Sequence, residues 1–320
     1  MKSAFSFAFV LLALPALAQR PSDPALLVPQ DAPAFTDYEI APEVVSLPPG
    51  VTMGAPASVA FDAKGHLLVL TRGDQAFFEF EPNGQLVRSF GGKIFTRAHG
   101  LRIDKEGFIW ATDVGAHTVM KLRPDGTVVM TLGVKGEAGA WDEAAGSRKL
   151  NQPNDVAIAP NGDIFVVQGH TPGPMGDPRV LKFDKNGTFL TQWGGRGTGR
   201  GQFVVAHGAA IDADGHLWVL DRENQRIQVF DTSGKYLREM KFAGLPCSIV
   251  LGATHHYMVN GFAGQLLRLD RDGKVLNAIG KPGTGLGEYG EAHFIAMGPA
   301  QEVIVADSVS GMLTKYVKKR

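Results

Sequence analysis

The chain has 320 residues, of which 32 are Lys or Arg and 32 are Asp or Glu, so it carries no net charge when its 9 histidines are neutral. This balance gives no reason to expect nucleic acid or an anionic membrane as a partner. The single cysteine, Cys247, excludes an internal disulfide, so stability must come from the packed core and from the way the chain closes on itself.

The first residues have the pattern of a secretory signal peptide. Lys2 precedes an apolar run over residues 4–14 that is too short to span a bilayer, and Ala16-Leu17-Ala18 offers a small-x-small cleavage site. We therefore expect residues 1–18 to be removed and the mature protein to be periplasmic or extracellular. Residues 19–37, which contain four prolines, should form an extended tail ahead of one domain at residues 38–320.

A repeated pattern of short apolar strands fills this domain. Six units start about 40 to 55 residues apart, and their first residues are Ala57, His99, Asn154, His207, Cys247 and His293. Each unit contains short strands rich in β-branched and aromatic residues, separated by turns such as Asp104-Lys105-Glu106-Gly107. This length and pattern are typical of a propeller blade, so the sequence predicts an all-β fold, a six-bladed β-propeller.

The two ends of the domain complement each other. The sixth unit stops after its third strand, at residues 313–317, whereas an additional apolar stretch at residues 38–47 precedes the first unit. Pairing of these segments would complete the last blade and remove the exposed strand edges. We therefore expect the N-terminal strand to close the ring, and we expect a monomer.

Three histidines occupy the same position of alternate repeats. They are His99, His207 and His293, and an alanine precedes each of them. In a ring of six blades, alternate blades lie about 120° apart, so three imidazoles can converge on the axis. A single histidine at the start of a strand is more often a packing or turn residue, but three equivalent ones with an open fourth position match the ligand set of a catalytic zinc ion.

The loops between the second and third strands should open on the same face as these histidines. Two of the six loops contain arginine, Arg72 in the first unit and Arg222 in the fourth. Arginine binds carboxylates through a bidentate fork, so two arginines beside a metal suggest an anionic substrate. The alternative is that each arginine simply pairs with a neighbouring acid, Asp74 or Glu223.

Several of these motifs resemble one enzyme family. His99-Gly100-Leu101 followed by Trp110-Ala111-Thr112-Asp113, Thr71-Arg72-Gly73-Asp74 and the run over residues 221–228 resemble the peptidyl-α-hydroxyglycine α-amidating lyases, propellers of NHL-type repeats. The similarity runs through residues 50–318. It implies zinc on the three histidines, with Arg72 and Arg222 around the substrate, and cleavage of the N–C bond of a peptidyl-hydroxyglycine to an amide and glyoxylate.

The chain departs from the family at two positions. His170 stands where the family has a tyrosine, the expected base, and histidine can either take the proton or become a fourth zinc ligand that closes the site. Phe294 follows His293 where the family has an aspartate that helps to bind a structural calcium with carbonyls matching Val59 and Leu101. Phenylalanine offers no oxygen, so calcium is in doubt here.

The sequence leaves three functions open. The leading interpretation is a zinc-dependent lyase acting on a small-molecule or peptide substrate that has a free carboxylate. The second is a metal-dependent propeller hydrolase of the lactonase kind, although such enzymes use oxygen ligands rather than three histidines. The third is a noncatalytic exported binding propeller, which predicts a protein without metal.

Overall fold

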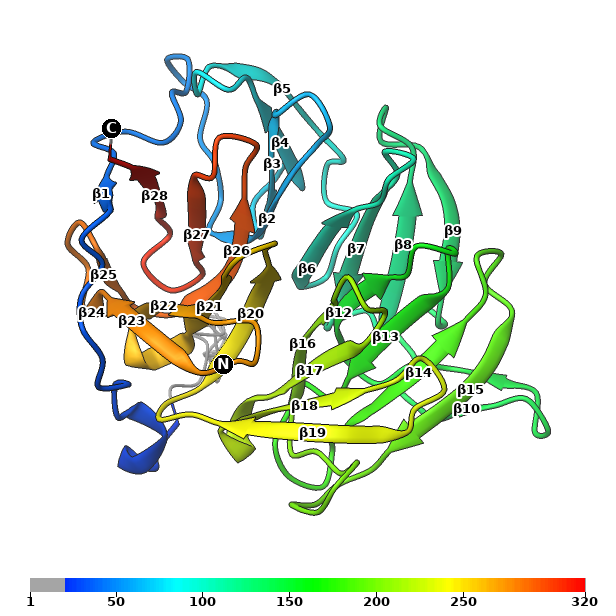
Figure 1. Cartoon of the computed structure of the whole chain (residues 1–320). Coiled ribbons are helices and arrows are strands. Elements are labelled where there is room, and N and C mark those ends of the chain that lie inside the picture. The colour runs from blue at the N-terminus through cyan, green and yellow to red at the C-terminus, as the bar shows by residue number, and fades with distance from the viewer. Residues whose placement is uncertain (1–20, 320) are drawn as a thin grey trace, which may run out of the picture.

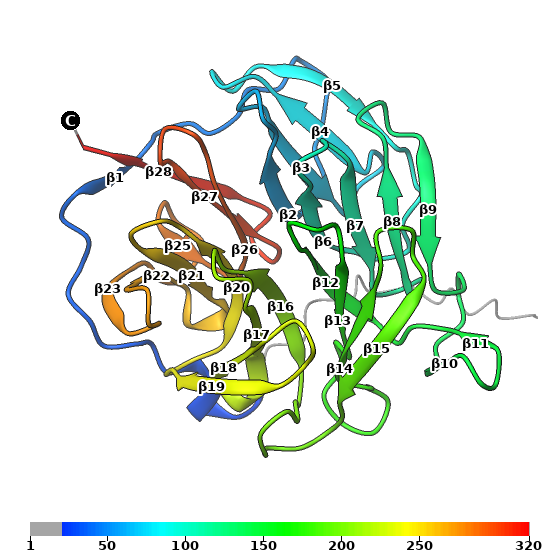
Figure 2. The ribbon, with the colours of Figure 1, turned by 45° about the vertical axis from the view of Figure 1, so that its right-hand side comes forward.

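The computed structural model describes residues 21–319, so the predicted signal peptide at residues 1–18 lies outside the described residues. Six four-stranded antiparallel sheets surround a central axis, which confirms the six-bladed β-propeller (Figures 1 and 2). No helix in this part of the chain is long and apolar enough to cross a membrane.

Each of the first three blades is built from four consecutive strands, counted from the axis outward. The first consists of β2 (Pro56–Phe61), β3 (Leu67–Thr71), β4 (Phe77–Phe80) and β5 (Leu86–Phe90). The second consists of β6 (Ala98–Ile103), β7 (Ile109–Asp113), β8 (Thr118–Leu122) and β9 (Val128–Leu132). A two-stranded excursion, β10 (Trp141–Asp142) and β11 (Ser147–Arg148), leads to the third blade, β12 (Pro153–Ile158), β13 (Ile164–Gln168), β14 (Arg179–Phe183) and β15 (Phe189–Gly194).

The other three blades complete the ring. The fourth consists of β16 (Ala206–Ile211), β17 (Leu217–Asp221), β18 (Arg226–Phe230) and β19 (Tyr236–Lys241), with the 3-10 turn η2 (Arg222–Asn224). The fifth consists of β20 (Pro246–Leu251), β21 (His256–Asn260), β22 (Gln265–Leu269) and β23 (Val275–Ile279), with η3 (Gly261–Ala263). A parallel pair, β24 (Lys281–Pro282) and β25 (Glu288–Tyr289), precedes β26 (Ala292–Met297), β27 (Val303–Asp307) and β28 (Leu313–Lys318) of the sixth.

The N-terminal strand closes the sixth blade. β1 (Tyr38–Ile40) pairs antiparallel with β28, with Tyr38 opposite Lys318. The strand is shorter than the predicted stretch at residues 38–47 because Pro42 has no N–H to donate to the ladder. Residues 44–47 instead cover the first blade, where the Ser46 N–H donates to the Gly84 carbonyl at 2.8 Å.

The described part of the tail ahead of β1 lies on the fifth blade. It forms one 3-10 turn, η1 (Pro24–Leu27), and then runs along β22 and β23. The Gln30 N–H donates to Gln265 Oε1 at 2.7 Å, and the Ala278 N–H donates to the Pro33 carbonyl at 2.9 Å.

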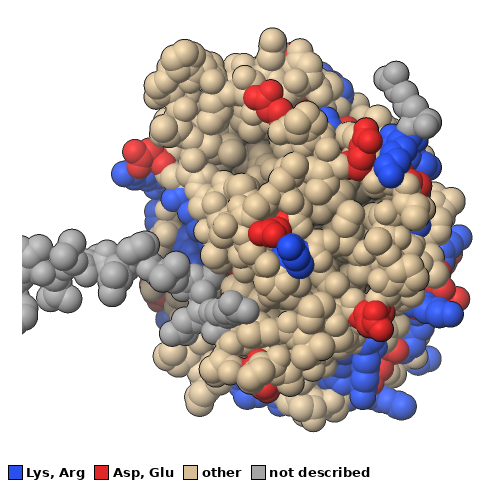
Figure 3. Space-filling model, turned by 90° about the vertical axis from the view of Figure 1, so that its left-hand side faces the viewer, with Lys and Arg blue, Asp and Glu red and all other residues tan. Residues whose placement is uncertain are grey.

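The side of the molecule that faces left in Figure 1 carries few charged side chains across its middle (Figure 3).

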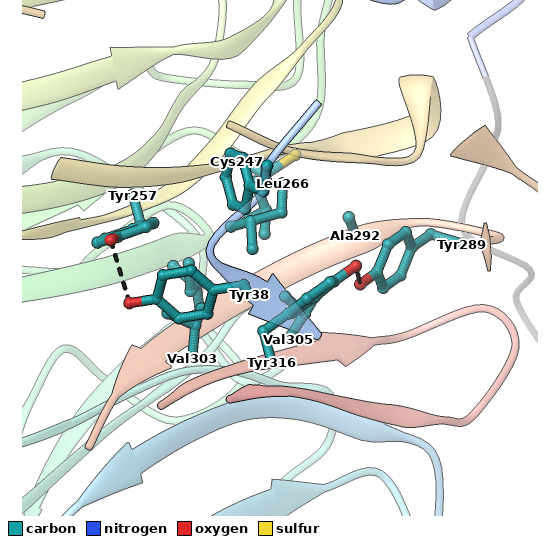
Figure 4. Packing of buried hydrophobic residues seen from close by; sticks show 12 residues of the cluster. Tyr38, Cys247, Tyr257, Leu266, Tyr289, Ala292, Val303, Val305 and Tyr316 are labelled. Atoms are coloured by element: carbon teal, nitrogen blue, oxygen red, sulfur yellow. Dashed lines mark hydrogen bonds between the residues drawn. The ribbon is translucent and has the colours of Figure 1, made fainter. Parts of the chain in front are cut away.

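The core lies between neighbouring blades. The inner strands are buried on both faces, as in β7, whereas the outermost strands alternate, as in β5. At the closure, Tyr38 and Tyr257 join their hydroxyls at 3.2 Å, and Tyr289 and Tyr316 join theirs at 2.6 Å (Figure 4). These four tyrosines belong to one buried cluster that ties β1 and β28 to the fifth blade.

Candidate metal centre

A β-bulge places each of the three histidines on the propeller axis. In the second, fourth and sixth blades, the pairing between the first two strands shifts register between Ala98 and Leu101, between Ala206 and Gly208, and between Ala292 and Phe294. The histidine lies within each bulge, and a bulge can turn a side chain out of the regular alternation. All three histidines are buried, with exposed fractions of at most 1%.

The next blade in the ring fixes the tautomer of each imidazole. His99 Nδ1 lies 2.7 Å from the Asn154 carbonyl, His207 Nδ1 lies 2.9 Å from the Cys247 carbonyl, and His293 Nδ1 lies 2.8 Å from the Ala57 carbonyl. A carbonyl only accepts, so each Nδ1 must carry the proton. Each Nε2 therefore presents a lone pair, as a metal-binding histidine requires.

The three histidines form a compact group whose ligand nitrogens all lie within 4.8 Å of one another. His293 Nε2 and His99 Nε2 are 3.2 Å apart, and His207 Nε2 is buried without a hydrogen-bond partner among the described residues. Lone pairs this close repel unless a cation joins them, so the residues fit a metal ion. Burial lowers the pKa of His293 to about 4 and lowers the pKa of His99 and His207 well below the usual range, which keeps all three neutral.

His170 lies beside the triad but outside the compact group. Its ring centre is 4.7 Å from that of His99, and its Nδ1 lies 2.8 Å from Asn154 Oδ1. The Asn154 amide donates through Nδ2 to the Ala206 carbonyl, so its oxygen accepts from His170 Nδ1–H, which leaves Nε2 of His170 as a proton acceptor. Burial, followed by the charges of Arg222 and Arg97, lowers the pKa of His170 well below its usual range.

The two predicted arginines lie near the triad in different states. Arg72 donates from Nε to the Ala98 carbonyl at 3.1 Å, and Asp74 pairs with Lys93 instead of Arg72. Burial, together with the charge of Arg97, lowers the pKa of Arg72 to about 10. Its outer guanidinium nitrogens form no hydrogen bond within residues 21–319.

Arg222 is buried and already paired with acids. It donates from Nε and Nη2 to Glu223 Oε1 at 3.0 and 2.7 Å, and its Nη1 lies 3.6 Å from Glu291 Oε1. Although burial alone would raise the pKa of Glu291, the neighbouring His293 and Arg222 lower it, so this acid is ionised. The pairing with Glu223 was the sequence alternative for Arg222.

Two charged residues near the triad were missed by the sequence analysis. Arg97 and Glu291 each stand two residues before a triad histidine, at equivalent positions of the second and sixth blades, and Val205 stands there in the fourth. The repeat alignment that revealed the histidines also contains this signal, because equivalent positions of alternate blades lie around the same axis. Because this position holds an arginine, a valine and a glutamate in the three blades, its place near the triad cannot be recognised from the sequence alone.

An aromatic ring and an arginine, Phe294 and Arg102, lie beside the triad. The Phe294 ring centre is 4.9 Å from that of His293, and the Arg102 guanidinium carbon is 5.6 Å from the Phe294 ring centre. Arg102 also donates to the carboxylate of fully buried Asp155 and, at 3.4 Å, to the Leu101 carbonyl, which the family resemblance implied as a calcium ligand. A guanidinium thus contacts an oxygen that calcium would need.

Two other groups of histidine and carboxylate side chains occur among the described residues, one formed by Asp62, His66 and Glu79, the other by Asp212, Asp214 and His216. Their carboxylates already have partners. Asp62 Oδ1 accepts from the backbone of its own turn, and Glu79 binds Arg88 at 2.7 Å. These groups carry no unpartnered buried ligand atom.

Known proteins similar to this chain include amidating enzymes. The NHL repeat family model matches residues 203–230. The peptidyl-glycine alpha-amidating monooxygenase of Mus musculus is 33% identical over 231 residues, which cover 61% of this chain and 23% of that protein. A probable peptidyl-alpha-hydroxyglycine alpha-amidating lyase of Caenorhabditis elegans is 38% identical over 150 residues, covering 46% of this chain and 40% of its own length. The chain thus spans less than half of either relative.

Solved structures confirm the fold. A streptogramin B lyase has a TM-score of 0.60 at 16% identity and covers 90% of this chain and all of its own. A gluconolactonase from Xanthomonas campestris has a TM-score of 0.61 at 18% identity and covers 94% of this chain and 99% of its own. At such identities the likeness concerns the propeller alone. The chain is thus a six-bladed β-propeller with a matched NHL repeat at residues 203–230, and its sequence is similar to those of amidating enzymes.

Proposed function

We propose that this chain is a zinc-dependent carbon–nitrogen lyase that cleaves a peptidyl-α-hydroxyglycine, or a similar hemiaminal with a free carboxylate, to an amide and glyoxylate. The observation that carries the proposal is the group of three buried imidazoles whose Nε2 atoms converge while each Nδ1 is bound to a backbone carbonyl. Three neutral nitrogen ligands with an open position suit a catalytic zinc. The names of the relatives supply the reaction class.

In the proposed reaction, His99, His207 and His293 hold the zinc ion. Bound zinc supplies Lewis acidity, which makes a substrate hydroxyl more acidic. His170 Nε2 takes the hydroxyl proton, the carbon–oxygen double bond forms, and the carbon–nitrogen bond breaks with its electron pair going to nitrogen. His170 then returns the proton to that nitrogen, so that the products are an amide and an aldehyde acid.

The same proposal gives the two predicted arginines different roles, with the substrate carboxylate bound by Arg72. Arg72 has free outer nitrogens that can form a bidentate pair with a carboxylate. Arg222 adds a positive charge next to His170 and His207, balanced by Glu223 and Glu291. A positive charge beside His170 favours its neutral form, which is the form that a base needs. No calcium is assigned, because Arg102 contacts the Leu101 carbonyl.

Glyoxylate release from N-benzoyl-α-hydroxyglycine by zinc-loaded protein tests the function. We expect benzamide and glyoxylate in equal amounts, and Arg72→Ala should raise the activation free energy by about 2 to 4 kcal/mol while the zinc content stays the same. The methyl ester of the substrate is the control, since its turnover should respond little to Arg72→Ala. Zinc-loaded protein that releases no glyoxylate but opens a lactone would instead establish the hydrolase alternative.

A further inference from the structure

Arg97 carries a guanidinium that the fold leaves without a partner. The residue is half-buried, and its backbone N–H donates to Asp113 Oδ1 at 2.8 Å. Within residues 21–319 its side chain forms neither a hydrogen bond nor an ion pair. A partly desolvated charge without a partner costs free energy, which binding of an anion can recover.

A cavity of about 80 Å³ between the first two blades brings Arg97 and Arg72 together. Thr71, Gly73 and Thr96 also line it, and no acidic residue does. Burial lowers the pKa of both arginines, and the charge of Arg97 lowers that of Arg72 further. Two guanidinium groups that repel each other in one cavity form a site for a carboxylate.

The two cavity arginines differ from Arg222 in their acidic neighbours. Three arginines, Arg72, Arg97 and Arg222, lie near two acidic residues, Glu223 and Glu291. Glu223 and Glu291 both form ion pairs with Arg222, whereas Arg72 and Arg97 interact with Glu291 only at longer range, through its charge. A carboxylate bound there would give these two arginines an ion-pair partner.

We propose that Arg97 is a specificity-determining residue that binds the substrate's carboxylate together with Arg72 in this cavity. The inference rests on the proposed lyase function for its choice of substrate, an α-hydroxy-α-amido acid. Ala98 lines the cavity and directly precedes His99 in β6, and the charges of Arg97 and Arg72 both act on His170. Arg222 then acts on His170 and not on the carboxylate.

Calorimetric titration with glyoxylate alone, on the full zinc-loaded chain, measures this site apart from turnover. Arg97→Leu should weaken binding about 10- to 100-fold, as expected for the loss of charge-assisted hydrogen bonds, and Arg97→Lys should restore part of the affinity. Arg123→Leu is the matched control. Arg123 is exposed and follows the end of β8, at the face opposite the histidines, so its loss should change the affinity less than about twofold.

Steady-state kinetics adds a second readout. Arg97→Leu should raise KM for N-benzoyl-α-hydroxyglycine about 10-fold or more and leave KM for its methyl ester unchanged. The inference is overturned if Arg97→Leu binds glyoxylate within about twofold of the wild type, or if the wild type binds none. The proposed lyase function has a separate test, because it fails if the wild type releases no glyoxylate from the substrate. If glyoxylate binding still depended on Arg97 in that case, the proposed carboxylate site would stand without the lyase function.

Discussion

The metal-free protein should lose stability as the pH falls through the range in which an exposed histidine titrates. His293 has a pKa of about 4 in the folded chain, against 6.5 for an exposed histidine. Between these values the unfolded chain binds a proton that the folded chain does not, so stability is present above pH 6.5 and is lost as the pH falls. At about pH 5, His293 alone should cost about 2 kcal/mol.

Urea unfolding in the presence of a chelator, at about pH 7.5 and about pH 5, measures this loss. His99, His207 and His170 have lowered pKa values as well, so the total loss should exceed the share of His293. In His293→Gln, the loss between the two pH values should shrink by about 2 kcal/mol, because glutamine does not titrate. If the wild type and His293→Gln lost equal stability over this interval, the interpretation of His293 as a buried neutral imidazole would be refuted.

Three further predictions concern single groups. His207→Ala should reduce bound zinc from about one equivalent to a small fraction, since two imidazoles bind zinc less tightly than three; undiminished zinc by metal analysis would contradict the triad. His170→Ala should remove most turnover but keep zinc, and His170→Tyr should restore part of the rate with a shifted pH profile. Loss of zinc in His170→Ala would instead show that His170 is a fourth zinc ligand. Arg102→Met should cost about 3 to 5 kcal/mol in urea unfolding by leaving Asp155 unpaired in the core, and adding Asp155→Asn should recover most of it; a loss below about 1 kcal/mol would exclude a structural ion pair.

The repeat pattern predicted what depends on position along a strand. His99, His207 and His293 could be found from sequence because a propeller places equivalent residues of alternate blades around one axis. The closure by β1 was predictable for a similar reason, since the sixth unit lacked one strand. The strand's end at Ile40 is set by Pro42, a local effect that the apolar pattern concealed.

Contacts between blades could not be predicted in this way. Arg102 reaches Asp155 across the blade boundary, and Arg222 reaches Glu291 from the fourth blade to the sixth. Such contacts depend on side-chain direction and on the spacing of the blades around the axis, which no pattern within one unit records. Arg97 belongs to the same class, because its proposed role depends on its side chain having no hydrogen-bond or ion-pair partner within residues 21–319.

The hydrogen bonds from the three imidazoles to the neighbouring blades have a mechanical consequence. His293 of the sixth blade is bound to the Ala57 carbonyl of the first blade. One of the three histidines therefore lies at the boundary where the last blade meets the first, which we call the seam of the ring. An ion bound by all three histidines would cross-link the second, fourth and sixth blades, which are not consecutive along the chain. The lone cysteine can form no covalent bridge within the chain that would do the same. The binding free energy of the ion would oppose separation of the first and sixth blades. A change that weakened the pairing of β1 with β28 would in turn lower the affinity for the ion.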